Sequence, residues 1–124
     1  MPSSPLDRYA QTQKAGLIGR DLEANILMKS ARRLSEVRLR LLDGEPVDST
    51  ALLANRRIWE ILMLSATAAD NPLPHETKKA IANIGLFVLR RTFDQMAKPT
   101  APGLTALIDL NRMIAEGLGQ KPAA

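Results

Sequence analysis

Residue types that could support catalysis are few and scattered along this chain. The only histidine, His75, directly follows a proline at an expected helix start, and a lone histidine in such a place is more often a surface residue than a catalyst. The sequence has no cysteine, which excludes disulfides, thiolate nucleophiles and sulfur-ligated metals. It has no glycine-rich phosphate loop, no zinc-binding histidine pair and no Gly-x-Ser-x-Gly elbow. We therefore predict a protein that is not an enzyme and has no metal or cofactor.

Basic side chains offer a second kind of chemistry, the binding of nucleic acid. The chain has 17 Lys and Arg against 13 Asp and Glu, a net charge of +4. The bases concerned are Lys29, Arg32, Arg33, Arg38 and Arg40, with the pairs Arg56-Arg57 and Arg90-Arg91 elsewhere. Between residues 20 and 43, however, six bases stand against four acids, and mixed signs weaken the attraction to phosphate. A solvated helix surface is the favoured interpretation, and an RNA contact is the alternative.

Five helical segments must position these side chains. Apolar residues recur at spacings of three and four, as amphipathic helices require, and aromatic residues make up only 3% of the chain, which disfavours a sheet. Short connections favour an all-α, compact bundle of about five helices. We expect one domain over residues 1–124, with a loose tail at about 120–124. The expected helices cover residues 4–16, 20–43, 50–69, 74–96 and 104–118.

Turn-forming residues set the expected helix boundaries. Gly16 and Gly19 separate the first two helices, and Asp48 or Ser49 can cap the third. Residues 71–74 are typical of a rigid turn, and residues 98–103 form a second helix breaker because both segments are rich in proline.

The chain shows no sign of a membrane-spanning segment. The longest uncharged apolar stretches, residues 61–69 and 81–89, are about half of the roughly 20 residues that a spanning helix needs. The first residues lack the basic and apolar regions of a secretory signal. We expect a cytoplasmic protein without membrane insertion.

Two Asn-Arg pairs are candidates for partner binding. Asn55-Arg56 and Asn111-Arg112 each lie on a strongly apolar helix, where they could orient a partner helix through hydrogen bonds. Alternatively, a satisfied polar pair would fix the register between helices of the bundle. We favour this structural interpretation, and the binding role stays open.

Two aromatic residues are further candidates. Trp59 could be a binding hot spot, although its place in the apolar stripe of a central helix favours the core. Tyr9 lies on a short segment that is followed by two glycines, and this segment could swing to clamp a ligand. The helices together have more apolar surface than one small bundle obviously needs, so a partner helix could fill a groove between them. That all of this surface packs internally is an equally good interpretation.

Five pieces of sequence in a fixed order resemble a known family. They are Tyr9; Arg20-Asp21-Leu22-Glu23; Asn55-Arg56-Arg57-Ile58-Trp59; Asn71-Pro72-Leu73-Pro74 with Ile81, Phe87-Val88 and Thr92; and the run from Leu107 to Leu118. In their order, spacing and total length they resemble the flagellar biosynthesis regulator FlaF family over almost the whole chain. The chain departs from that pattern at Gly85, where a larger residue is expected, and in the proline-containing connector at 99–103.

The resemblance implies a cytoplasmic, non-enzymatic protein that is required for flagellin synthesis and export. It implies a flagellin-binding secretion chaperone that also acts on flagellin translation, in opposition to a second regulator, FlbT. The terminal segments of flagellin form amphipathic helices, and an apolar groove could cover them before export by hydrophobic burial. An RNA-binding regulator of the flagellin messenger, acting through the basic side of residues 20–43, is the alternative function.

Overall fold

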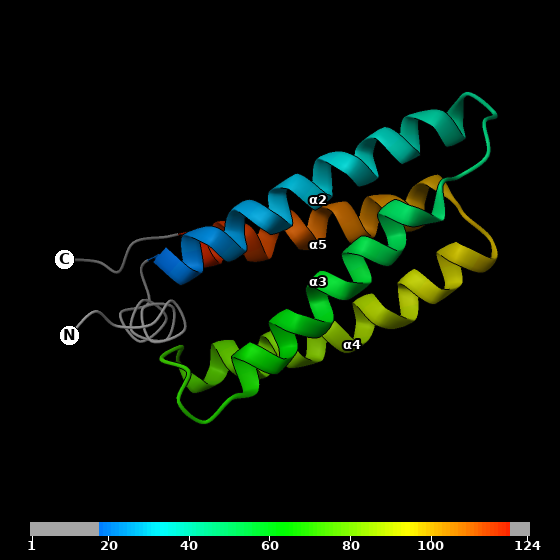
Figure 1. Cartoon of the computed structure of the whole chain (residues 1–124). Coiled ribbons are helices and arrows are strands. Elements are labelled where there is room, and N and C mark those ends of the chain that lie inside the picture. Colours follow the sequence, from blue (N-terminus) through cyan, green and yellow to red (C-terminus); the bar gives the residue numbers. More distant parts are fainter. Residues whose placement is uncertain (1–17, 120–124) are drawn as a thin grey trace.

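The apolar spacing produces four α-helices in the computed structural model, which describes residues 18–119 (Figure 1). They are α2 (Ile18–Leu42), α3 (Ser49–Thr67), α4 (His75–Ala97) and α5 (Ala101–Gly119), and this range contains no strand. The all-α prediction is confirmed, with four helices in place of about five. The helix expected at 4–16, which includes Tyr9, and the tail expected at 120–124 lie outside the described residues.

The four helices pack as two antiparallel pairs. Helix α2 packs along α5, and α3 packs along α4, while α2 contacts α3 and α4 contacts α5 less extensively. Figure 1 shows that successive helices run in opposite directions and that the two pairs lie at an angle to each other. The first and last helices of the described range are therefore neighbours, and the α3/α4 hairpin lies across them.

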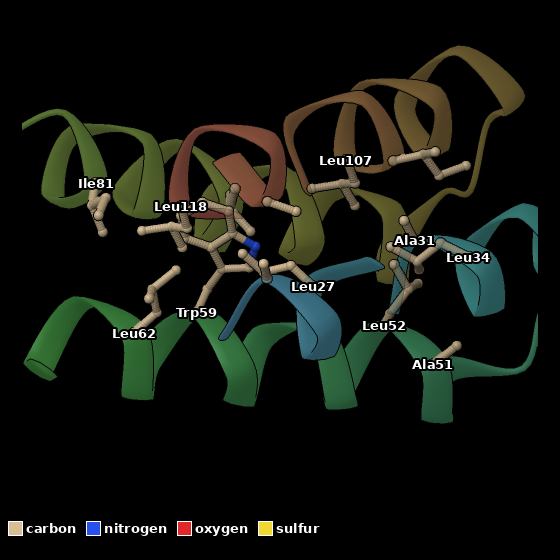
Figure 2. Packing of buried hydrophobic residues seen from close by; sticks show 14 of the residues in the cluster. Leu27, Ala31, Leu34, Ala51, Leu52, Trp59, Leu62, Ile81, Leu107 and Leu118 are labelled. Atoms are coloured by element: carbon tan, nitrogen blue, oxygen red, sulfur yellow. The ribbon is translucent and has the colours of Figure 1, made fainter. Parts of the chain in front are cut away.

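The core lies between the two pairs and confirms the expected apolar stripes. Figure 2 shows Trp59 among Leu27, Leu62 and Leu118, which come from three different helices. Burying a large apolar side chain contributes about 1.5–3 kcal/mol relative to leaving it exposed, so this set dominates the stability of the bundle. The apolar side chains with at most 1% of their surface exposed are Leu27, Ala31, Leu34, Leu52, Trp59, Ala66, Ile81, Val88, Leu104, Leu107 and Ile108.

The link between α2 and α3 begins with a glycine and ends with a capping aspartate. Gly44 has a φ of +80°, a left-handed conformation that suits glycine, and Glu45 N donates a hydrogen bond to Arg40 O at 2.9 Å. Asp48 Oδ1 then accepts a hydrogen bond from Thr50 N at 2.9 Å, so Asp48 caps α3. The hydrogen bonds from Thr50, with smaller contributions from nearby arginines, lower the pKa of Asp48.

The turn between α3 and α4 is built around Asn71, as the rigid-turn interpretation expected. The Asn71 side chain donates from Nδ2 to Ser65 O and accepts from Leu73 N, both at 2.9 Å. The first bond ties the turn to the last turn of α3, and the second closes the turn on itself. His75 follows at the exposed start of α4.

Two expected boundaries were wrong. Gly19 lies inside α2 and does not separate two helices. Helix α5 begins at Ala101, three residues before the predicted start, because Thr100 caps it: Thr100 Oγ1 accepts a hydrogen bond from Gly103 N at 3.1 Å. Pro102 fits in this first turn, where its missing N–H would have had no helical partner.

Gly85 occupies a close contact between α3 and α4. It is buried, and a Cβ at this position would overlap the Met63 side chain. The larger residue expected at this position would have to displace the Met63 side chain from where it lies. Glycine lets the Met63 thioether pack directly against the α4 backbone.

Candidate functional site

Three of the six candidate binding residues meet inside the bundle. Asn55, Trp59 and Asn111 all have 0% of their surface exposed. Trp59 Nε1 donates to Asn111 Oδ1 at 2.8 Å, and Asn111 Nδ2 donates to Asn55 Oδ1 at 2.7 Å. Helices α3 and α5 are thus joined by two buried hydrogen bonds.

This buried polar network also includes α2. Ser30 Oγ donates to Asn55 Oδ1 at 2.8 Å, and Asn111 Nδ2 makes a second, longer bond of 3.3 Å to Leu27 O. Only Asn55 Nδ2 lacks an acceptor among the described residues. Because buried polar groups are costly unless they are bonded, the network favours one register of α2, α3 and α5. The burial supports the structural interpretation of the two asparagines and of Trp59.

The arginines of the two Asn-Arg pairs lie on the outside. Arg56 and Arg112 are exposed, since consecutive residues of a helix point about 100° apart. Arg56 Nε forms an ion pair with Glu60 Oε1 at 2.9 Å on the surface of α3, and such exposed pairs contribute little to stability. The structure therefore separates each pair into an inward amide and an outward guanidinium. The sixth candidate, Tyr9, lies outside the described residues.

An apolar hollow lies between the first half of α2 and the second half of α3, and we call it the α2/α3 groove. It encloses about 140 Å³ and lies toward the end of the bundle where α2 begins and α3 ends (Figure 1). Three of its aliphatic side chains are substantially exposed: Leu22 at 48%, Ile26 at 39% and Ile61 at 53%. The full lining is Leu22, Glu23, Ile26, Leu27, Ile58, Ile61, Leu62 and Ser65.

The chemistry of the α2/α3 groove suits binding. An apolar cavity of about 150 Å³ holds a benzene molecule, so a hollow of this size fits one large apolar side chain. The lining offers mainly aliphatic carbon, with Glu23 and Ser65 as its polar members. A partner helix could place one apolar residue in the hollow and lay neighbouring residues on Leu22, Ile26 and Ile61.

The sequence predicted that a partner helix could fill a groove between helices, but it did not indicate which residues line that groove. The available signal was the excess of apolar surface over the needs of one small bundle. That signal indicates that some aliphatic residues stay exposed, but it does not say which ones.

Other exposed apolar side chains lie mostly on α3 and α4, with Leu39 and Leu42 on α2 and Met113 on α5. They do not line the α2/α3 groove, and Phe87 is partly engaged by Arg91, whose guanidinium carbon lies 5.1 Å from the ring centre. This arrangement has the geometry of a cation–π contact. Those on α3 and α4 are Leu53, Leu64, Leu86, Phe87, Phe93 and Met96.

The basic residues of α2 lie on a surface of mixed charge. Arg33 and Arg40 border a second hollow, of about 200 Å³, together with Glu36 and Asp48. Arg38 is partly buried, and its Nη1 donates to Thr105 Oγ1 at 2.8 Å. Carboxylates among the arginines reduce the attraction to a phosphate backbone, so this surface gives no specific support to RNA binding.

Two further findings concern metals and membranes. Within residues 18–119, no group of three or more His, Cys, Asp or Glu side chains is placed to hold a metal ion. None of α2 to α5 combines the length and the apolar character that crossing a bilayer requires.

A comparison with known protein families gives a match over most of the chain. The family model described as flagellar protein FlaF matches residues 5–118, a range that includes the α2/α3 groove and the buried polar network. Comparisons with curated proteins and with solved structures found no match.

Proposed function

The chain belongs to the FlaF family of flagellar proteins, which act in flagellar biosynthesis, and from this premise we propose that it is a flagellin-binding secretion chaperone that also regulates flagellin synthesis. The proposed ligand is a terminal helical segment of flagellin. In this proposal the protein binds flagellin in the cytoplasm before export and is not an enzyme. Opposition to the regulator FlbT belongs to the same proposal.

The observation that supports flagellin binding is the α2/α3 groove. Leu22, Ile26 and Ile61 expose aliphatic surface although the helices that bear them already bury a full apolar side in the core. Exposed aliphatic side chains around a hollow are typical of sites where an amphipathic helix docks. The terminal segments of flagellin have such an apolar side, which would otherwise associate prematurely.

Hydrophobic burial would drive the interaction. Each Å² of apolar surface removed from water contributes about 25 cal/mol, and the ordering of a flexible segment offsets a large share of this gain. A groove that takes one large side chain therefore needs the flanking aliphatic surface as well. Contacts at helical spacing along α2 and α3 would supply that surface.

The test is co-expression with flagellin, followed by size exclusion and calorimetry. We expect the two proteins to migrate together, and the double variant Ile26→Lys/Ile61→Lys to lose the complex because it places two charges in the apolar contact. Leu86→Lys is the control, since Leu86 is an aliphatic residue that is 60% exposed on α4 and does not line the groove. Separate migration with no heat of binding at tens of micromolar would overturn the chaperone proposal.

The regulatory part of the proposal needs its own measurement. A translational flagellin reporter is compared in cells that express the wild type, the groove double variant or the Leu86→Lys control. If regulation follows from binding, the groove variant alone loses its effect on the reporter. A groove variant that loses flagellin binding but regulates normally would show that the two activities are separate.

A further inference from the structure

The α3/α4 hairpin has an outer face with exposed apolar side chains that neither the core nor the α2/α3 groove uses. On α3, Leu64 is 74% exposed and lies about 140° around the helix from the buried Trp59. On α4, Phe93 is 73% exposed and lies about 140° from the buried Val88. These side chains therefore point away from α2 and α5. The apolar residues of this hairpin outer face are Leu53, Leu64, Leu86 and Phe93, none of which lines the groove.

The packing of Met63 on Gly85 fixes which parts of the two helices lie side by side. The helices run in opposite directions (Figure 1), so residues that are equally far along the chain from this contact lie at about the same level. The hairpin outer face then has two apolar ends, Leu64 with Leu86 and Leu53 with Phe93. At 1.5 Å per residue, these ends are about 16 Å apart along α3.

Charged side chains cross the middle of the hairpin outer face. On α3, Glu60 Oε1 lies 2.9 Å from Arg56 Nε, and Glu60 Oε2 lies 3.6 Å from Arg57 Nη1. On α4, the exposed Arg90 lies at the level of Arg57 and forms no ion pair within residues 18–119, not even with Asp94 one turn later. Because Glu60 is already shared by two arginines, the middle of this face has an excess of positive charge.

We propose that the hairpin outer face binds an amphipathic helix of a partner protein that has an acidic centre between two apolar ends. The partner places apolar residues at positions i and i+11 on the two ends of the face. An Asp or Glu at i+4 or i+7 then lies over Arg90, since these four positions share one side of a helix. This surface is separate from the α2/α3 groove, so the inference goes beyond flagellin binding and does not depend on it.

The area and charge of the face favour such a helix over a second copy of the chain. The four apolar side chains expose on the order of 400 Å², the size of a surface patch that is often functional. A stable dimer buries about 800 Å² on each subunit, and a second copy would bring its own excess of arginines against Arg57 and Arg90. A lipid surface fits less well, because Glu60 would enter the apolar layer together with the two ends.

The first experiment measures binding of two labelled synthetic helices of about 15 residues to the full chain by fluorescence anisotropy. The acidic probe has Leu at i and i+11 and Glu at i+4 and i+7, and the basic probe has Lys in place of both Glu residues. We expect the acidic probe to bind about tenfold more tightly, as a few partly exposed charge pairs allow. Equal affinities for the two probes would overturn the inference.

Two variants test the residues that the inference names. Arg90→Glu should reduce the preference for the acidic probe to less than about twofold, and Phe93→Ala should weaken the binding of both probes by about threefold to tenfold. Arg32→Glu is the matched control, because Arg32 is exposed on α2, outside the hairpin, and its reversal changes the net charge equally. Equal losses of preference in the two reversal variants would show a response to net charge alone and would overturn the inference.

NMR and sedimentation locate the occupant of the face. The acidic probe should shift the amide signals of Leu64, Leu86 and Arg90 but not that of Ile26, and shifts confined to groove residues would overturn the inference. A dimer of the free chain, or binding to phosphatidylglycerol vesicles, would also overturn it if Phe93→Ala abolished that association. Flagellin is absent from every one of these measurements, so their failure would leave the proposed function untouched.

Discussion

Helix α3 contains two regions in which polar and apolar side chains have exchanged their usual places. On its inward side, Asn55 has its whole amide in the core and Trp59 donates a hydrogen bond there. On the side that faces the α2/α3 groove, Ile61 leaves 53% of its surface exposed. Helix α2 repeats the contrast, with Ser30 buried at 4% exposure and Ile26 exposed at 39%.

This contrast indicates which side chains are available for a function other than stabilising the fold. The buried amides of Asn55 and Asn111 bond to each other and to groups of α2, so they have a structural reason to be polar, although Asn55 Nδ2 has no acceptor among the described residues. The exposed aliphatic residues have no comparable structural reason. Polar and aromatic residues are the usual candidates for partner contact, but in these two regions the aliphatic residues are the accessible ones.

Asn111→Ala should have the largest effect on the buried polar network. It leaves Trp59 Nε1 without its acceptor and removes one of the two donors to Asn55 Oδ1. Each buried polar group left without a partner costs about 1–3 kcal/mol. With the cavity left by the lost side chain added to the unpaired Trp59 Nε1, we expect the free energy of unfolding to fall by about 3 kcal/mol, measured by urea denaturation.

Arg112→Ala is the matched control for this variant. Arg112 is the next residue on α5 but is exposed, and surface substitutions usually change stability by less than about 0.5 kcal/mol. A loss under about 1 kcal/mol for Asn111→Ala would contradict a structural role. It would return Asn111 to the set of partner-contact candidates.

Trp59→Phe should have a smaller effect, because it keeps an aromatic ring in the core and removes the Nε1 donor. We expect a loss of about 2 kcal/mol from the reduced packing and the unpaired Asn111 Oδ1. A double-mutant cycle with Asn111→Ala isolates the hydrogen bond, and we expect a coupling energy of about 1 kcal/mol. Strictly additive losses would mean that Trp59 stabilises the bundle by packing alone.

Much of the fold follows from local sequence, and its exceptions have local causes. The stripes on α2 to α5 predict the helices and most of the core, because periodic apolar residues need one buried side. The start of α5 was misplaced because Pro102 and Gly103 read as breakers, whereas Thr100 caps the helix and makes both residues acceptable in its first turn. Gly19 was misread for a similar reason, since a single glycine near a helix start is tolerated.

The α2/α3 groove could not be located from the sequence because it depends on how the helix pairs are arranged. Helices α2 and α3 each pack most closely on a different partner, α5 and α4 respectively. Helix periodicity places Leu62, at 4% exposure, in the buried stripe with Trp59 and Ala66, and it places Ile61 about 100° away, where it is half exposed. The local pattern does not show whether another helix covers that second side of α3, because this depends on how the pairs pack.

Substitution of Ile61 tests whether the exposed aliphatic residues of the groove contribute more to partner binding than to stability. Ile61→Ala should lower the free energy of unfolding by less than about 1 kcal/mol, because half of the side chain is already in contact with water. Leu62→Ala, its buried neighbour, should cost about 2–3 kcal/mol. The flagellin Kd, measured by calorimetry, should weaken mainly for Ile61→Ala. A reversed order of the two stabilities would contradict the assignment of Ile61 to an open groove.

The smallest effects are expected on the basic side of α2. Reversing Arg32, Arg33 and Arg40 to Glu should change the flagellin Kd by less than about twofold, because these exposed residues lie outside the groove and exposed charges contribute little.

A gel shift with flagellin messenger over a salt series tests the RNA alternative on the same variants. Direct binding to phosphates would weaken steeply as salt rises and would be lost on reversal. With Glu36 and Asp48 beside Arg33 and Arg40, we expect no such salt-dependent shift. If one were found, the basic side of α2 would replace the groove as the place where regulation of flagellin synthesis begins.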